Sequence, residues 1–196
     1  VSVNRNSTNY EVDEVLCDGR KIASMAIEHL LKLGHSNIAY VGNIRNEARF
    51  EGYMEAMRKH DIEVLPELIF DTDQTESHGY EVMENVLKSE ERPTAFYCAN
   101  DITAVGMIKC LNRYRNRYYV PSIIASDNIY ESRYTKPMLT TINLPREEMG
   151  RFTVELLVDR IRGRHQNVMR LEIEGNLVVR DSCAPVDETY ITEYCI

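Results

Sequence analysis

Apolar residues along this chain alternate between two spacings, one typical of helices and one typical of buried strands. Over residues 20–33 they fall on one helical face, and Gly34 follows where such a helix would end. Residues 38–41 form a short apolar run typical of a buried strand, closed by Gly42. This order of elements predicts a protein in which helices cover a sheet.

The same alternation continues through most of the chain. Its further predicted helices include residues 50–57, 80–87 and 102–111, and its further predicted strands lie near 67–70, 94–98 and 122–125. Repeated units of strand and helix with this spacing build a parallel sheet with helices on both faces. The predicted fold class is therefore α/β, with a doubly wound and mostly parallel sheet.

The rhythm changes after residue 137. An extended segment at 139–142 is followed by Pro145, which introduces a helix predicted to reach Gly163. Its apolar positions form one stripe, made of Met149, Phe152, Leu156 and Ile161.

Two alternating segments close the fold, near residues 169–173 and 177–179. The dipeptide Gly175-Asn176 between them is typical of a two-residue turn. We therefore expect a closing hairpin at the carboxyl end. The acidic tail from residue 184 onward is expected to be frayed.

Charge and cysteine content narrow the functional classes. The 196 residues carry a formal net charge of −8, which argues against nucleic-acid binding through this surface, because phosphate contacts need clustered Lys and Arg. The five cysteines include no CxxC pair and are odd in number, so a reducing cytoplasm is expected. No apolar run reaches the length of a membrane span, and we expect no leader with a basic start and an apolar middle, so no membrane partner is predicted.

The chain lacks the common signatures of catalysis. It has no GxSxG elbow, no P-loop, no GxGxxG and no pair of histidines at metal-binding spacing. Asp71, Asp73 and Glu76 lie in one segment, but three acids in a loop are more typical of a solvated surface than of a cation site. The sequence therefore predicts neither an enzyme nor a bound metal or cofactor.

Polar residues follow the strand predicted at 94–98. Asn100 and Asp101 come directly after it and directly before a helix, where open α/β sheets bind ligands. This position predicts a small-molecule site. An Asn-Asp pair before a helix is equally typical of a helix cap, and the two interpretations of Asn100 remain open.

Taken in order, several segments resemble the effector-binding core of the LacI/GalR (lactose/galactose repressor) family of bacterial transcription regulators. The resemblance spans residues 1 to about 183 and depends on Gly34-His35, residues 38–42, Arg49 with Gly52-Tyr53, residues 93–101, Ala104, Gly106, Asp127-Asn128, residues 139–142, Met149-Gly150 and residues 177–182. Each piece is weak alone, but their order and spacing are specific.

The resemblance implies a two-lobed sensor of the periplasmic-binding-protein type I fold, with a sugar or similar effector held between the lobes. It implies a cytoplasmic homodimer that reaches operator DNA only through an N-terminal headpiece, which this sequence lacks. Effector binding would change the angle between the lobes and thereby control operator binding. We accordingly expect the chain to be a truncated core.

The family topology also divides the chain. It implies the end of the first lobe and a crossing at 1–5, the second lobe at 6–143, a helix of the first lobe at 144–166, closing strands of the second lobe at 167–183 and a tail at 184–196. Since most of the first lobe would be missing, the stripe on the helix of 144–166 is expected to be exposed and to pair with a second copy.

Five residues match effector-binding positions of the family: Asp127, Arg49, Asn100, Arg45 and Asn4. Asp127 lies just past a predicted strand, at its carboxyl end, and Asp and Arg form paired hydrogen bonds with adjacent hydroxyls. Arg45 precedes Arg49 by about one helical turn, so the two are expected to share a face. Asn4 would lie at the lobe crossing.

One departure affects the expected ligand. Gln74 stands where several members of the family stack an aromatic ring on the ligand, so a more polar effector, or recognition by the missing lobe, is expected. The alternative functions are a lobe of an exported sugar-binding protein and, less favoured, an enzyme on the same fold. The free cysteines and the match at residues 177–180 favour the regulator.

Overall fold

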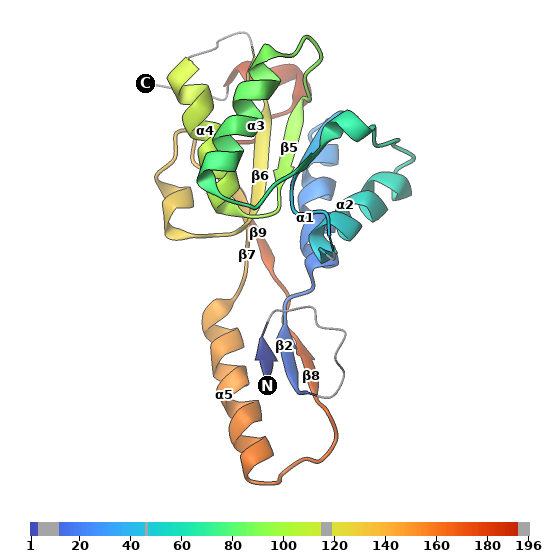
Figure 1. Cartoon of the computed structure of the whole chain (residues 1–196), viewed down its shortest axis with the longest axis vertical. Helices are drawn as coiled ribbons and strands as arrows, with labels where there is room; N and C mark the ends of the chain where they lie inside the picture. The colour runs from blue at the N-terminus through green and yellow to red at the C-terminus, as the bar shows by residue number, and fades with distance from the viewer. Residues whose placement is uncertain (4–11, 46, 115–118, 192–196) are drawn as a thin grey trace.

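A six-stranded sheet with helices on both faces forms the larger part of the molecule, and a three-stranded sheet with one helix forms the smaller part (Figure 1). The computed structural model describes residues 1–3, 12–45, 47–114 and 119–191. The chain passes between the two parts several times, so residues distant in sequence contribute to each.

The large sheet has the strand order β4-β3-β5-β6-β7-β9. All neighbouring strands are parallel except β9, which pairs antiparallel with β7. The strands are β3 (Ile38–Gly42), β4 (Ile69–Asp71), β5 (Ala95–Cys98), β6 (Ser122–Asp127), β7 (Thr140–Asn143) and β9 (Asn176–Val178). The predicted mostly parallel α/β sheet is thereby confirmed.

Two helices cover each face of this sheet. Helices α1 (Gly19–Lys32) and α2 (Ala48–Lys59) pack on one face, and α3 (Glu76–Lys88) and α4 (Asp101–Tyr114) on the other. Alternate residues of β3 serve the two cores, because Ile38 and Tyr40 pack with α1 and α2 whereas Ala39 and Val41 pack with α3 and α4. Among the described residues, short 3₁₀ segments lie at η1 (Pro66–Leu68), η2 (Tyr130–Arg133) and η3 (Val186–Ile191).

The order of strands creates a switch point between β3 and β5. From β3 the chain crosses through α2 to β4 on one side, and then returns through α3 to β5 on the other side. Helices that leave in opposite directions open a crevice at the carboxyl ends of the two strands, which is where such sheets bind ligands. The fold therefore places the switch point of the sheet, the position at which such sheets bind ligands, beside Gly42 and Cys98.

The smaller part contains β1 (Ser2–Val3), β2 (Glu14–Leu16) and β8 (Arg170–Glu172), all parallel, with α5 (Arg146–Ile161) packed on β1 and β2. The predicted closing hairpin is wrong, because β8 pairs with β2 while β9 pairs with β7 in the other sheet. An alternating pattern determines which face a strand buries but not which strand it pairs with.

This pairing also changes the grouping of the chain. The sequence grouped residues 14–16 and 170–172 with the large sheet, but the structure pairs both segments within the small sheet. The helix predicted at 146–163 is present as α5, and it packs against β1 and β2 of the small sheet.

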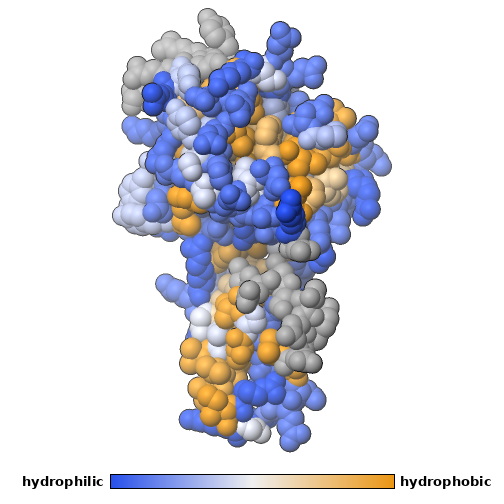
Figure 2. Space-filling model, in the orientation of Figure 1, coloured by the Kyte–Doolittle hydropathy of each residue, from blue (hydrophilic) through white to orange (hydrophobic). Residues whose placement is uncertain are grey.

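The apolar stripe predicted on α5 is largely turned inward. Met149 is buried, and Phe152 and Leu156 pack against the core, so exposure of these three residues was wrongly expected. Ile161 is exposed at 76%, as expected, and the exposed apolar face also includes Val154 and Leu157. Figure 2 shows apolar surface at this end of the molecule.

The segment after residue 183 is packed rather than frayed over its first residues. His35 is buried and its Nε2 lies 3.0 Å from the carbonyl oxygen of Ala184. The amide of Val186 donates to the carbonyl of Leu33 at 2.9 Å. The expectation of fraying from residue 184 is therefore wrong, since these contacts hold the segment on α1.

A buried carboxylate anchors the far end of α5. Asp13, in the segment before β2, accepts hydrogen bonds from Nε of Arg160 at 2.9 Å, from the amide of Met169 at 2.8 Å and from Nε2 of His165 at 3.1 Å. The pKa of Asp13 is held far below its usual range, mainly by the hydrogen bonds from Arg160. Burial of the carboxylate opposes this lowering.

We expect Asp13→Ala to lower the free energy of unfolding by about 2 to 3 kcal/mol, because it leaves Arg160 without its buried partner. Urea denaturation at pH 7 measures this loss. Because the folded state depresses the pKa of Asp13, its contribution is present above the ordinary Asp pKa of about 4 and declines as the pH falls below it. The matched control is Asp159→Ala on the exposed surface of α5; an equal loss there would contradict the role of Asp13.

Candidate functional site

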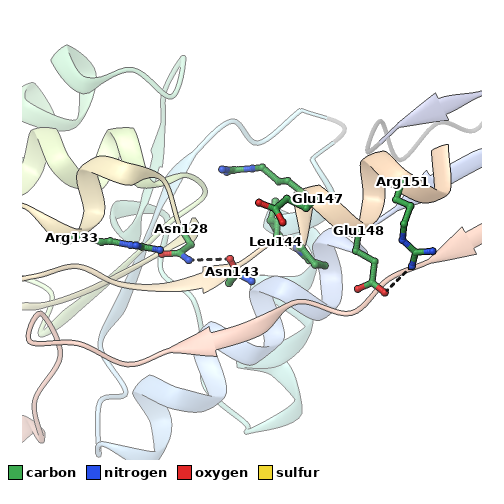
Figure 3. Close-up of a pocket in the computed structure, with 9 residues that line it drawn as sticks. Asn128, Arg133, Asn143, Leu144, Glu147, Glu148 and Arg151 are labelled. Carbon is green, nitrogen blue, oxygen red and sulfur yellow. Dashed lines mark hydrogen bonds and ion pairs between the residues drawn. The ribbon is translucent and has the colours of Figure 1, made fainter. Parts of the chain in front are cut away.

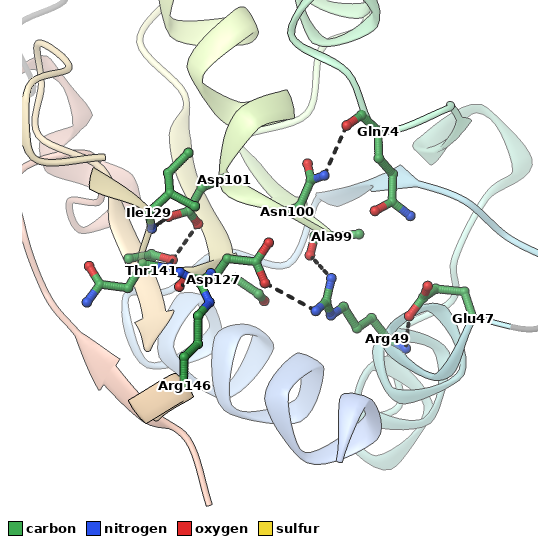
Figure 4. A network of polar contacts seen from close by, with 12 residues as sticks. Glu47, Arg49, Gln74, Ala99, Asn100, Asp101, Asp127, Ile129, Thr141 and Arg146 are labelled. Atoms are coloured by element: carbon green, nitrogen blue, oxygen red, sulfur yellow. Dashed lines mark hydrogen bonds and ion pairs between the residues drawn. The ribbon is translucent and has the colours of Figure 1, made fainter. Parts of the chain in front are cut away.

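Arg49 lies at the switch point between β3 and β5. It lies in the first turn of α2, where the side chain of Glu47 caps the helix by accepting from the amide of Arg49 at 3.2 Å. Its Nη1 donates to the carbonyl oxygen of Ala99, directly after β5, at 2.7 Å (Figure 4). The guanidinium is therefore held across the switch point of the sheet.

Asp127 meets Arg49 from the end of β6. Its Oδ1 lies 3.3 Å from Nη2 of Arg49, and the two side chains are only 22% and 14% exposed. Burial raises the pKa of Asp127 above its ordinary value, although Arg49 and Arg146 oppose that rise. The structure thus brings together two of the five residues that match effector-binding positions of the family.

This pair keeps hydrogen-bonding capacity for a ligand. Within the described part of the chain, Oδ2 of Asp127 and Nε of Arg49 have no hydrogen-bond partner. A carboxylate beside a guanidinium offers an acceptor and a donor to neighbouring hydroxyl groups. The chemistry of the pair is therefore suited to a polar, uncharged ligand with adjacent hydroxyls.

The backbone that presents Asp127 is strained. Asp127 has a φ of 136° and Asn128 a φ of 50°, and such conformations persist only where the surroundings fix them. Nδ2 of Asn128 donates to Oδ1 of Asn143 at 2.9 Å, and Oδ1 of Asn128 accepts from Nη2 of Arg180 at 2.6 Å. The turn is thereby held by β7 and by the segment after β9.

Asp101 holds the same turn through hydrogen bonds to Thr141 and Ile129. It is fully buried at the start of α4, where its Oδ1 accepts from Oγ1 of Thr141 at 2.5 Å and its Oδ2 accepts from the amide of Ile129 at 3.0 Å. The sequence treated the Asn100-Asp101 pair as a cap or a ligand contact and missed this role. No local signal distinguishes a buried Asp after a strand from an exposed one.

Burial raises the pKa of Asp101 to about 6, and hydrogen bonds from Thr141 and Ile129 limit the rise. We expect a ¹³C NMR titration of its carboxyl group to show a midpoint near 6. Since the folded pKa exceeds the unfolded value of 3.8, the associated stability is fully present below pH 4 and is lost as the pH rises through 6. A midpoint at or below 4 would contradict the burial of this carboxyl group.

Asn100 acts as a cap in this structure. Its Oδ1 accepts from the amide of Thr103 at 3.1 Å and from Oγ1 of Thr103 at 2.6 Å, and its Nδ2 donates to the carbonyl oxygen of Gln74 at 3.0 Å. These bonds fix the start of α4 and the loop before α3. A ligand contact by Asn100 stays a prediction.

Arg45 does not share a helical face with Arg49. Helix α2 begins at Ala48, so Arg45 lies in the preceding loop, where it is exposed. It borders a hollow of about 390 Å³ together with Asp71, Thr72 and His78. The expected shared face is wrong because Glu47 starts the helix after Arg45. Asn4 lies outside the described residues.

A hollow lies where β7 leads into α5 (Figure 3). It measures about 780 Å³ and is lined by Asn128, Arg133, Asn143, Leu144, Pro145, Arg146, Glu147, Glu148 and Arg151. It borders the turn of Asp127 but not the Asp127 carboxylate itself. Its volume falls in the range of small-molecule sites, and it opens between the two parts of the molecule.

Neither a metal centre nor a membrane span is present in the described part of the chain. No group of three or more His, Cys, Asp or Glu side chains in residues 1–3, 12–45, 47–114 and 119–191 is placed to hold a metal ion. No helix among these residues is long and apolar enough to cross a membrane.

Comparison with known proteins identifies the family. Residues 27–183 match the profile of the periplasmic binding protein-like domain. The chain belongs to this family, in its LacI branch. The HTH-type transcriptional repressor PurR of Mannheimia succiniciproducens is 32% identical over 181 residues, which cover 89% of this chain and 54% of that protein. PurR of Serratia proteamaculans is 35% identical over 167 residues, which cover 82% and 48%. This LacI-family chain thus spans about half the length of the curated relatives it matches.

Solved LacI-family structures share the fold. The transcriptional regulator CelR in complex with cellobiose matches with a TM-score of 0.83 and 27% identity, over 92% of this chain and 57% of CelR. A LacI family regulator of Enterococcus faecium with bound ribose matches with a TM-score of 0.81 and 29% identity, over 93% and 69%. The resemblance inferred from the sequence is confirmed.

Proposed function

We propose that this chain is the effector-binding core of a LacI-family transcriptional regulator, and that it binds a sugar or sugar-like effector at the Arg49–Asp127 pair. The observation that carries the proposal is this pair at the switch point, where two residues 78 positions apart meet with polar capacity unused in the described part of the chain. Operator DNA would be bound by a headpiece outside these 196 residues.

The ligand class follows from the chemistry of the pair and from related structures. Carboxylate and guanidinium groups bind adjacent hydroxyls with defined geometry, and regulators of similar fold carry cellobiose and ribose. We assign the large sheet to the second lobe, and α5 with the small sheet to the first. The effector would then lie between them, beside the Asp127 turn.

The relatives favour a regulator over the alternatives. The matched curated proteins are transcriptional repressors, and the matched structures are transcriptional regulators. An exported sugar-binding lobe shares the fold but has no comparable support here. An enzyme on the same fold likewise has no support among the relatives named above.

The test is isothermal titration calorimetry of the protein against D-ribose, cellobiose, further mono- and disaccharides and their phosphates. Saturable binding of one uncharged sugar, lost in Asp127→Asn and Arg49→Lys, is the expected result. Binding that survives both substitutions would move the site elsewhere. If none of these sugars bound, the assignment of a sugar as the effector would be refuted.

We also propose that the protein is a homodimer in which the exposed apolar face of α5, made of Val154, Leu157 and Ile161, contributes to the contact. Sedimentation velocity at micromolar concentration is expected to give a dimer for the unchanged chain and a monomer for Leu157→Glu. Glu155→Gln, a neighbouring change on the polar surface of α5, is the matched control. A monomer in every sample would refute this contact.

A further inference from the structure

Helix α5 begins at the ligand-facing turn. Its first residue, Arg146, donates from Nη2 to the backbone carbonyl oxygen of Asp127 at 2.7 Å (Figure 4). This bond reaches the strained peptide that orients the Asp127 carboxylate toward Arg49. Any rotation of that peptide therefore moves the acceptor of Arg146.

The opposite end of α5 is fixed to the small sheet. Arg160, in its last turn, is bound to the buried carboxylate of Asp13 and to the carbonyl oxygens of Gln166 and Asn167. The helix has 16 residues. At a rise of 1.5 Å per residue, that is about 24 Å of continuous helix. Figure 1 shows α5 running from the end of β7 alongside the small sheet. One arginine at each end of this helix thus bonds to a different part of the molecule.

We propose that Arg146 is a positioning residue that couples the Asp127 turn to α5, so that a change at the Arg49–Asp127 pair is carried along α5 to the small sheet. The proposal deepens the proposed function, since it identifies the regulatory connection of the same site. The coupling acts on the backbone of Asp127. It supplements the covalent connection between β7 and α5, which runs through Asn143, Leu144 and Pro145.

Arg151 is the natural control on the same helix. Its guanidinium contacts Glu155 at 3.0 Å, Glu148 at 3.7 Å and the ring of Phe152, all within α5. It therefore has the charge and the exposed position of an α5 arginine without a bond to the Asp127 turn. Arg151→Ala removes a cation from α5 and leaves the proposed coupling intact.

The test needs no effector, because Arg49→Lys or Arg49→Ala alters the site directly. Amide hydrogen exchange by NMR is read at two reporters of the small sheet: Glu14, whose amide donates to Met169, and Ile173, whose amide donates to Leu16. In the unchanged background, Arg49→Ala is expected to alter exchange of both amides by about threefold or more.

In a protein that already carries Arg146→Ala, the same Arg49 substitution is expected to change the exchange rates of these two amides by less than about 1.5-fold. The exchange rates of amides in the large sheet should still change. The Arg151→Ala background is expected to behave as the unchanged one, and Arg146→Lys to restore part of the response. If Arg49→Ala impairs folding, Arg49→Lys provides the milder perturbation.

Two results would overturn the proposal. The Arg49 substitution could change amide exchange at Glu14 and Ile173 equally with and without Arg146, or it could cause no change at these amides in the protein that retains Arg146. Failure of the sugar panel would refute the assigned ligand but would not alter these measurements. Conversely, the protein could bind a sugar at Asp127 and still show equal changes in amide exchange with and without Arg146. That result would retain the proposed function and reject the coupling.

Discussion

Replacing Asp127 with asparagine is expected to weaken sugar binding by about 100-fold, with D-ribose as the first probe. Loss of the charge converts charge-assisted hydrogen bonds, worth about 1.5 to 3 kcal/mol, into neutral ones and changes an acceptor into a donor. A loss of about 2.7 kcal/mol corresponds to that factor. Asparagine is preferred over alanine because Asp127 has a φ of 136°, where a short polar side chain is better tolerated.

Calorimetry at pH 7 measures the change, and Asp73→Asn is the matched control, since the Asp73 side chain is 84% exposed in another loop. Circular dichroism verifies that both variants are folded. Because burial raises the pKa of Asp127, affinity of the unchanged protein is also expected to fall as the pH drops toward the acid range. Unchanged affinity in Asp127→Asn would remove this residue from the site.

Replacing Gly106 with alanine is expected to lower the free energy of unfolding by about 3 kcal/mol or more. Helices α3 and α4 approach so closely here that an added Cβ would lie 1.9 Å from the carbonyl oxygen of Glu76. Gly79 faces the same interface from α3, where a Cβ would lie 2.0 Å from the carbonyl oxygen of Thr103. Since the obstacle is backbone, the two helices must separate and the core between them must loosen.

Gly150→Ala provides the opposite expectation within the same protein. Gly150 lies in α5 with nothing within 4 Å of an added Cβ, so alanine should stabilise the protein by about 0.5 to 1 kcal/mol through its higher helix propensity. Thermal and urea denaturation compare the two variants. If Gly106→Ala did not lower the free energy of unfolding, α3 and α4 would not meet through these glycines.

Local patterns were sufficient to predict most elements of the large sheet. The helix expected at 20–33 is α1, and the strand expected at 94–98 is β5, because apolar spacing reports directly on backbone periodicity. The same spacing gave no information on strand partners. Segments 169–173 and 177–179 therefore suggested a hairpin, although each pairs with a distant strand.

Some residues of the candidate site could be predicted from the sequence, whereas others were identified only in the structure. Arg49 and Asp127 were predicted from family resemblance and from their position after buried strands, and the structure brings them to 3.3 Å. Arg45 was misplaced because the start of α2 depends on the cap by Glu47, and a shift of a few residues changes the face. The support given by Asp101, Arg146 and Arg180 carried no local signal.

The sequence by itself determined the alternation of strands and helices, the family, and the two charged residues at the carboxyl edge of the sheet, because periodicity and short motifs are local properties. Only the tertiary structure decided the separation into two sheets, the buried faces of α5 and the bonds that hold the Asp127 turn. Those bonds join residues 15 to 52 positions apart, and such contacts depend on how the whole chain packs.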